Sequence, residues 1–207
     1  AVGNNASASA QSAIAVGQNA AASGINTISI GMNTTATKDH GIAMGTSSKS
    51  LGVQSVGVGS FTEATADSVV AVGQNAKAGG VAAPGGKGSG TAAVAVGYDA
   101  NASAANTFAG GKSATASVDN AVALGVQSNA SARTASALGG YSQASAERAT
   151  AVGAASKASG TASFAGGTSA NASGLNSVAI GGSMDTAKGA QASGDYSIAQ
   201  GTNSTSK

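Results

Sequence analysis

The stretch Asn120–Ser128, with the sequence NAVALGVQS, is one copy of a unit that recurs along the whole chain. Each copy is a short apolar run closed by a glycine, which here is Gly125. Eleven of the thirteen intervals between these glycines are 14 residues long, and the other two are 24 and 20 residues. The glycines are Gly3, Gly17, Gly31, Gly45, Gly59, Gly73, Gly97, Gly111, Gly125, Gly139, Gly153, Gly167, Gly181 and Gly201. A fixed period predicts a stacked array in which each unit contacts its neighbours.

The composition of the 207 residues limits what this array can be. Only 9% of the residues are charged and 3% aromatic, cysteine and tryptophan are absent, and Pro84 is the single proline. Such a chain cannot build a thick core of leucine and phenylalanine. The alternatives are low-complexity disorder and a thin repetitive fold, and the constant register favours the fold.

Charge and hydropathy exclude two classes of partner. The formal charge of +2 is scattered, which argues against nucleic acid as a partner. The sequence contains no apolar run of about 18 residues, so we expect no direct membrane insertion by this segment. The repeat is already in register at Gly3, so we expect the segment to belong to a larger protein.

Two strands are expected in each unit. Val122 and Leu124 are large and apolar, and Ala123 lies between them, so both faces of this first strand are apolar and a strand of that kind is normally buried on both sides. Small residues follow three and five positions after the glycine, as at Ala76 and Ala78, and alternate with polar residues. This pattern predicts a second, half-buried strand.

Two strands and two tight turns fit in 14 residues, which predicts an all-β, parallel β-roll whose flattened coils pair about 4.8 Å apart. The sequence leaves open which apolar face of the first strand turns inward. If the large residues are counted as interior, the apolar interior of each coil consists of a Val/Ile pair and two alanines. The other apolar face still needs a cover, so we expect self-association, for which cyclic symmetry is the usual solution.

The array is predicted to be a single roll over residues 1–207 with two loop insertions, at 81–90 and at 183–194 around Met184. Two coils carry the sequence FAGG, in which Gly110 and Gly166 replace the large residue before the closing glycine. The phenylalanine two positions earlier is expected to fill the space that the glycine leaves.

The residues 176–181, NSVAIG, carry a resemblance to a known family. The unit resembles the head repeat of trimeric autotransporter adhesins, the YadA-like family, over essentially the whole chain. The copy at 176–181 departs from the consensus three residues after its glycine, where Met184 stands in place of serine. The copy at 120–128 keeps that serine.

The resemblance implies a left-handed roll that forms a homotrimer on the outer surface of a Gram-negative bacterium, as the exported passenger of an outer-membrane-anchored protein. It implies an adhesin head that binds a host extracellular matrix protein (of the collagen, fibronectin or laminin type) or a host cell surface. The ligand-binding residues that it implies are Asn120, Val122, Ala123, Leu124, Gly125, Asn176, Ser177, Val178, Ala179, Ile180 and Gly181. Core packing is the alternative role for these residues, and a spacer that projects another binding domain is the alternative function.

Catalysis is not expected. His40 lies in a predicted turn and is the only histidine. A single histidine excludes a multi-histidine metal site within one chain, and its place in a turn argues against a histidine-based triad. A glycan-cleaving solenoid enzyme would need paired carboxylates facing one groove, whereas the acidic residues, among them Glu63, Asp67, Glu147 and Asp185, are few and dispersed along the chain. We therefore expect no enzyme, cofactor or metal. Three Asn-Ala-Ser glycosylation sequons, at Asn101, Asn129 and Asn171, are interpreted as by-products of the repeat.

Overall fold

The computed structural model describes residues 1–80, 91–185 and 188–207, which form strands and turns without a helix. The predicted insertion at 81–90 lies outside the described residues. Contacts within the chain define two compact units, residues 1–107 and 108–207, and each is described by itself.

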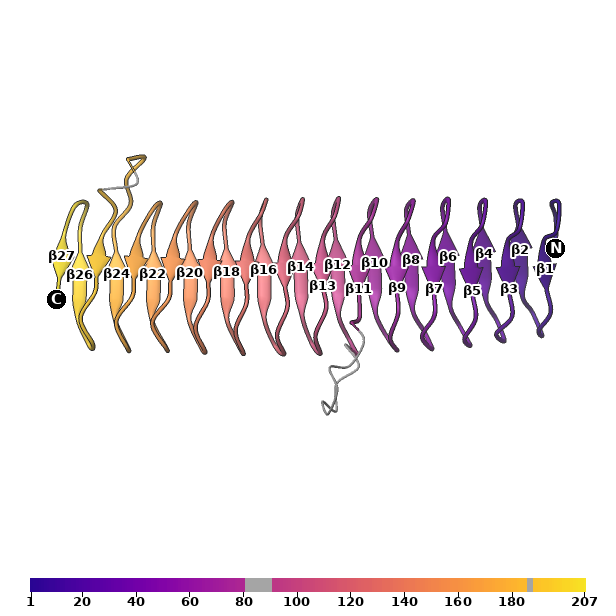
Figure 1. Ribbon diagram of the computed structural model, residues 1–207, viewed down its shortest axis with the longest axis horizontal. Coiled ribbons are helices and arrows are strands. Elements are labelled where there is room, and N and C mark those ends of the chain that lie inside the picture. The colour runs from indigo at the N-terminus through magenta and orange to yellow at the C-terminus, as the bar shows by residue number, and fades with distance from the viewer. Residues whose placement is uncertain (81–90, 186–187) are drawn as a thin grey trace. The chain divides into compact units, whose positions relative to one another are not determined.

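Unit 1 contains the first thirteen strands (Figure 1). Its three-residue strands are β2 (Ile14–Val16), β4 (Ile28–Ile30), β6 (Ile42–Met44), β8 (Val56–Val58), β10 (Val70–Val72) and β12 (Val94–Val96). Its two-residue strands are β1 (Ser7–Ala8), β3 (Ala21–Ala22), β5 (Thr35–Ala36), β7 (Lys49–Ser50), β9 (Glu63–Ala64), β11 (Lys77–Ala78) and β13 (Asn101–Ala102). Each kind of strand pairs in parallel with its own kind, so two sheets face each other.

Unit 2 repeats this arrangement with fourteen strands. The three-residue strands are β14 (Phe108–Gly110), β16 (Val122–Leu124), β18 (Ser136–Leu138), β20 (Thr150–Val152), β22 (Phe164–Gly166), β24 (Val178–Ile180) and β26 (Ile198–Gln200). The two-residue strands are β15 (Thr115–Ala116), β17 (Asn129–Ala130), β19 (Gln143–Ala144), β21 (Lys157–Ala158), β23 (Asn171–Ala172), β25 (Gln191–Ala192) and β27 (Thr205–Ser206). The predicted parallel, all-β coil with a 14-residue period is confirmed.

The register places equivalent repeat positions side by side. Val122 pairs with Ser136, and Ser136 pairs with Thr150, each one coil further along the chain. Backbone hydrogen bonds continue this stacking through the turns, where the N–H of Asn19 donates to the carbonyl of Asn4 at 2.8 Å. Each coil is thus held to the next along both its strands and its turns.

The interior of the coils contains small side chains almost throughout, with Val69 the largest fully buried one, which corrects one prediction. In the coil of Gly125 the interior residues are Ala121, Ala123, Ser128 and Ala130, all fully buried. The large pair, Val122 and Leu124, faces outward instead of filling the coil. The two sheets lie so close together that alanine, serine or threonine fills the gap at almost every interior position. The Val/Ile pair that we counted as interior is therefore on the surface.

Interior serines and threonines three residues after the closing glycine bond the backbone of the turn. Ser128 donates from Oγ to the carbonyl of Gly125 at 3.0 Å, and Ser142 and Ser156 bond the carbonyls of Gly139 and Gly153 at 2.8 Å. The same carbonyls also accept the backbone N–H of these serines, at 3.3 Å. A buried hydroxyl without a partner would be costly, so this contact explains how a serine can stand three residues after the closing glycine.

The 20-residue interval accommodates its extra residues between Gly181 and Ala190. The N–H of Ala190 donates to the carbonyl of Gly181 at 3.0 Å, which is the hydrogen bond that closes an ordinary turn between Ala20 and Gly17. Gln191–Ala192 then form β25. Gly181 and Ala190 thus close an ordinary turn, and the last part of the range 183–194 belongs to the regular roll (Figure 1).

Candidate interaction surface

An apolar stripe covers the outer face of the three-residue strands in each unit. The strand alternation that turns alanine inward turns the residues on either side outward. The stripe residues with more than a third of their surface exposed are Ile14, Val16, Ile30, Met44 and Val96 in unit 1, and Phe108, Leu124, Val152, Ile180 and Ile198 in unit 2. Soluble monomers rarely expose a contiguous apolar patch of more than a few hundred Å². The apolar stripe is therefore a candidate interface.

The outer face of the two-residue strands is polar. Its residues are the first members of these strands, such as Thr115, Asn129 and Gln143 in unit 2. In unit 1, Glu63 lies between two lysines, with its carboxylate 3.2 Å from Nζ of Lys49 and 3.8 Å from Nζ of Lys77. Exposed ion pairs of this kind contribute little to stability. We call this surface the polar face.

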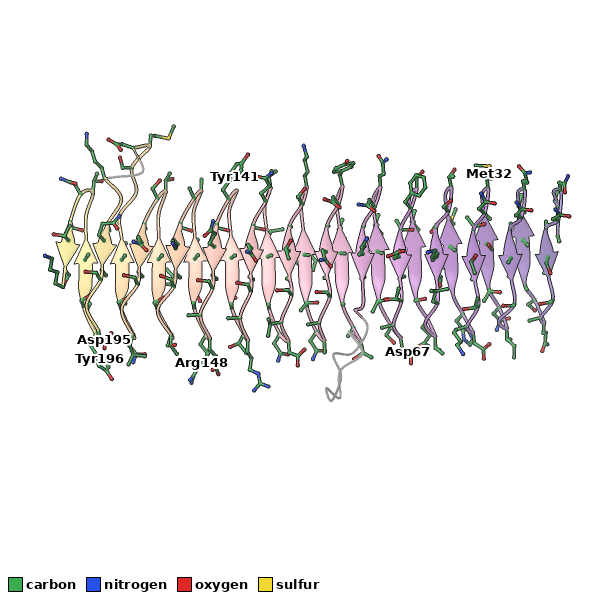
Figure 2. All side chains as sticks on the ribbon, viewed as in Figure 1. Met32, Asp67, Tyr141, Arg148, Asp195 and Tyr196 are labelled. Atoms are coloured by element: carbon green, nitrogen blue, oxygen red, sulfur yellow. The ribbon has the colours of Figure 1, made fainter. Side chains whose placement is uncertain are left out.

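Two rows of turns border the sheets. The glycine turn contains the closing glycine and the two residues after it, and the second turn lies on the opposite edge of the coil. Figure 2 shows Met32 in a glycine turn and Asp67 in a second turn of unit 1. In unit 2 it shows Tyr141 in a glycine turn and Arg148 in a second turn.

One non-glycine residue in nearly every turn adopts a left-handed backbone conformation, with φ between 53° and 62°. Asparagine tolerates this conformation better than most residues. Side-chain amides also stack from coil to coil, since Asn5 donates to Asn19 at 3.3 Å and Asn19 donates to Asn33 at 2.9 Å. Sequence reasoning missed these ladders, although asparagine at 14-residue spacing was their visible signal.

The residues expected to bind a ligand do not form one surface. Val122, Leu124, Val178 and Ile180 lie on the apolar stripe, where Leu124 is 49% exposed and Ile180 44% exposed. Ala123, Ser177 and Ala179 are fully buried inside the roll. Asn120 and Asn176 are exposed left-handed residues of second turns, and Gly125 and Gly181 close the strands with φ of 132° and 150°.

The residues considered for chemistry are scattered, and each has its own structural contact. His40 is a left-handed turn residue whose Nε2 lies 3.4 Å from Nδ2 of Asn26. Asp67 accepts a hydrogen bond from the backbone N–H of Val53, and Asp185 is paired with Lys188 at 3.3 Å. Within the described residues, no three His, Cys, Asp or Glu side chains gather as a metal site would require.

No helix among the described residues is long and apolar enough to cross a membrane.

Together these features define a class: a parallel β-solenoid of 14-residue coils with a small-residue interior and an outward apolar stripe. Comparison with protein families matches the chain to the YadA head domain repeat (2 copies). The matches cover residues 1–20, 22–48, 50–76, 89–114, 109–128, 116–142, 130–156, 144–170, 158–183 and 188–206. The chain belongs to this family and is a YadA-like head domain of a trimeric autotransporter adhesin. No curated protein matches it. The family and the solenoid fold indicate a structural, non-enzymatic protein and a surface-exposed autotransporter passenger.

Proposed function

We propose that three copies of the chain, each a left-handed roll, associate through their apolar stripes and form a head that attaches a bacterium to host matrix. The exposed apolar stripe is the single observation that carries this proposal. When identical chains bury the stripe against one another, the apolar surface removed from water stabilises the assembly by about 25 cal/mol per Å². Identical chains associate most simply with cyclic symmetry, and three copies fit the family.

In such a trimer the polar face and the turns stay accessible to a ligand. Each coil presents them again in the same orientation, and three chains triple the number of copies. Weak contacts with a repetitive matrix protein then add up through effective concentration. A collagen-, fibronectin- or laminin-type protein, or a host cell surface, is the proposed partner of a head that the cell displays on its outer membrane.

The proposed trimer gives the outward members of the expected binding set a different role. Val122, Leu124, Val178 and Ile180 would be covered by the other two chains. Their expected role in ligand binding and their role in assembly are therefore alternatives, and one pair of substitutions distinguishes them.

The experiment compares the unmodified chain with the double variants Leu124→Ser/Ile180→Ser on the stripe and Asn129→Ser/Gln143→Ser on the polar face. Sedimentation equilibrium at low micromolar concentration should give three times 19.0 kDa for the unmodified chain and for the polar-face variant. The stripe variant should give a lower mass. A folded monomer of unmodified chain would overturn the assembly.

Binding is then measured on surfaces coated with collagen, fibronectin or laminin, and on epithelial cells. Avid binding by the trimer, weakened in the polar-face variant, is the expected result. A trimer with no affinity for any of these surfaces would contradict the adhesive role and leave the segment as a spacer that projects another domain.

A further inference from the structure

Two coils of unit 2 carry an unusual pair of residues on the apolar stripe. In the coil of Gly111 the outward pair is Phe108 and Gly110, and in the coil of Gly167 it is Phe164 and Gly166. A Cβ on Gly110 would lie 2.7 Å from Cε1 of Phe108, and a Cβ on Gly166 would lie 2.7 Å from Cε1 of Phe164. Each ring therefore occupies the place of the missing side chain, as the sequence predicted. The ring leans along the strand over the glycine, and at Gly110 Cδ1 of Leu124 lies beside the same space, 2.8 Å from the Cβ position.

The rest of the stripe in unit 2 is also uneven. Between the two Phe–Gly coils, Ser136 and Thr150 place hydroxyl groups at the position that is otherwise large and apolar. From β14 to β26 the outward pairs read Phe108/Gly110, Val122/Leu124, Ser136/Leu138, Thr150/Val152, Phe164/Gly166, Val178/Ile180 and Ile198/Gln200. Neighbouring pairs differ in size or polarity along most of the stripe, because the similar pairs Val122/Leu124 and Val178/Ile180 are not adjacent.

Unit 1 shows the contrast. Its outward pairs are Ile14/Val16, Ile28/Ile30, Ile42/Met44, Val56/Val58, Val70/Val72 and Val94/Val96, all of them aliphatic or methionine. A copy of the chain displaced by one coil, about 4.8 Å, would meet almost the same surface. Uniform surfaces specify register weakly. Unit 1 therefore offers affinity between copies but little discrimination between registers.

Register decides whether the assembly closes. Identical chains related by a pure rotation form a closed ring, whereas a shift of one coil at each contact produces a screw that never closes. In a contact shifted by one coil, the Phe108/Gly110 coil would face the larger Val122/Leu124 pair. Ser136 of one chain would then face Thr150 of the other, while the remaining hydroxyls would face Val122 and Phe164. Voids and buried hydroxyls without partners both cost free energy.

We propose that the Phe108/Gly110 and Phe164/Gly166 coils, with Ser136 and Thr150 between them, set the register in which copies of this chain associate. This inference rests on the proposed self-association through the apolar stripe. The partner is a second copy of the chain, and the selected contact is coil against the identical coil.

The test makes the stripe of unit 2 uniform in the full chain. The variant combines Phe108→Val, Gly110→Ile, Ser136→Val, Thr150→Val, Phe164→Val and Gly166→Ile, all of which are compatible with a strand. The matched control, Val122→Ile with Val178→Ile, enlarges the stripe but keeps its pattern. A spin label on Asn129→Cys reports distances between copies, and it is unique because the chain has no other cysteine. All proteins are refolded from denaturant so that the register is chosen anew.

The unmodified chain and the control should give one narrow distance distribution and a trimeric mass. The uniform variant should add longer distances, because each coil of shift separates the labels by about a further 4.8 Å along the roll axis, and species heavier than a trimer. A uniform variant with the same single distance and only a trimeric mass would overturn the register proposal while leaving the trimer intact. A monomeric unmodified chain would instead overturn the proposed function on which this inference rests. If the uniform variant does not fold, it is replaced by Ser136→Val/Thr150→Val alone. Its distance distribution should broaden toward longer distances, and an unchanged distribution would contradict the register proposal.

Discussion

The carboxylate of Asp67 accepts a hydrogen bond of 2.8 Å from the backbone N–H of Val53, which lies 14 residues earlier in the second turn of the preceding coil. The same contact joins Asp39 to Ile25 at 2.9 Å and Asp195 to Leu175 at 2.8 Å. In each case the carboxylate supplies an acceptor to a turn N–H. An aspartate six residues before a closing glycine thus fastens one coil to the next.

Replacing Asp67 with alanine should therefore destabilise the roll. The lost hydrogen bond to a charged group is exposed, so we expect a decrease of about 1 kcal/mol in the free energy of unfolding. Asp67→Asn keeps the Oδ1 acceptor, so its free energy of unfolding should decrease by less than half as much as that of the alanine variant. Guanidinium unfolding at one fixed protein concentration measures both, because assembly makes stability concentration-dependent. Equal losses in the two variants would show that the hydrogen bond is not the cause.

The closing glycines provide a sharper contrast. Gly125 has φ of 132°, and a Cβ there would lie 2.6 Å from the carbonyl oxygen of Gly139 in the next coil. We expect Gly125→Ala to cost about 3 kcal/mol or more, or to prevent folding, because both the backbone conformation and the space require glycine. Circular dichroism and thermal unfolding measure this cost.

The adjacent turn glycine is the matched control for that change. A Cβ on Gly140 would meet only the carbonyl oxygen of Val126, at 3.8 Å. Gly140→Ala should be neutral or stabilise the roll by up to about 1 kcal/mol, because alanine restricts the unfolded chain. Similar losses at the two positions would contradict the close approach of neighbouring coils at Gly125.

Enlarging an interior residue tests the two-sheet core. Ala123 is fully buried and is paired in register with Ala109 and Ala137 in the neighbouring coils. Ala123→Val should destabilise the chain by about 1–3 kcal/mol through overpacking. Val122→Ile, on the outward face of the same strand, should change the free energy of unfolding by less than about 0.5 kcal/mol. The reverse ranking would mean that the large residue faces inward.

The repeat allowed most of the fold to be predicted, because a strand alternation and a 14-residue period are local patterns. The sequence left open which face of the first strand turns inward, and the count of a Val/Ile pair as interior was wrong. Ala123 and its neighbours Val122 and Leu124 are all apolar, so hydropathy alone cannot say which face is inside. The answer depends on the narrow gap between two sheets, which is a property of packing. Contacts such as that between Asp67 and Val53 were also missed, because they exist only once the register between coils is known.

The candidate site could be predicted less well than the fold, because a repeat motif combines residues with different structural duties. Ser177 and Ala179 of the motif are interior, Val178 and Ile180 are outward, and Asn176 is a turn residue. The resemblance treats them as one set. Only the structure separates the side chains that a ligand or another chain can touch from those that hold the coil together.

Asn176 provides a test that separates a structural role from a binding role. Its φ is 53°, and its N–H donates to the carbonyl of Thr161 in the preceding coil at 2.9 Å. Asn176→Gly retains the left-handed conformation and should change the free energy of unfolding by less than about 0.5 kcal/mol. Asn176→Val places a β-branched residue there and should cost about 1–2 kcal/mol. Thermal unfolding ranks the two variants, and binding to matrix-coated surfaces is measured in parallel. Loss of binding by the stable glycine variant would assign the Asn176 side chain to the ligand, whereas full binding by that variant would assign it to the turn.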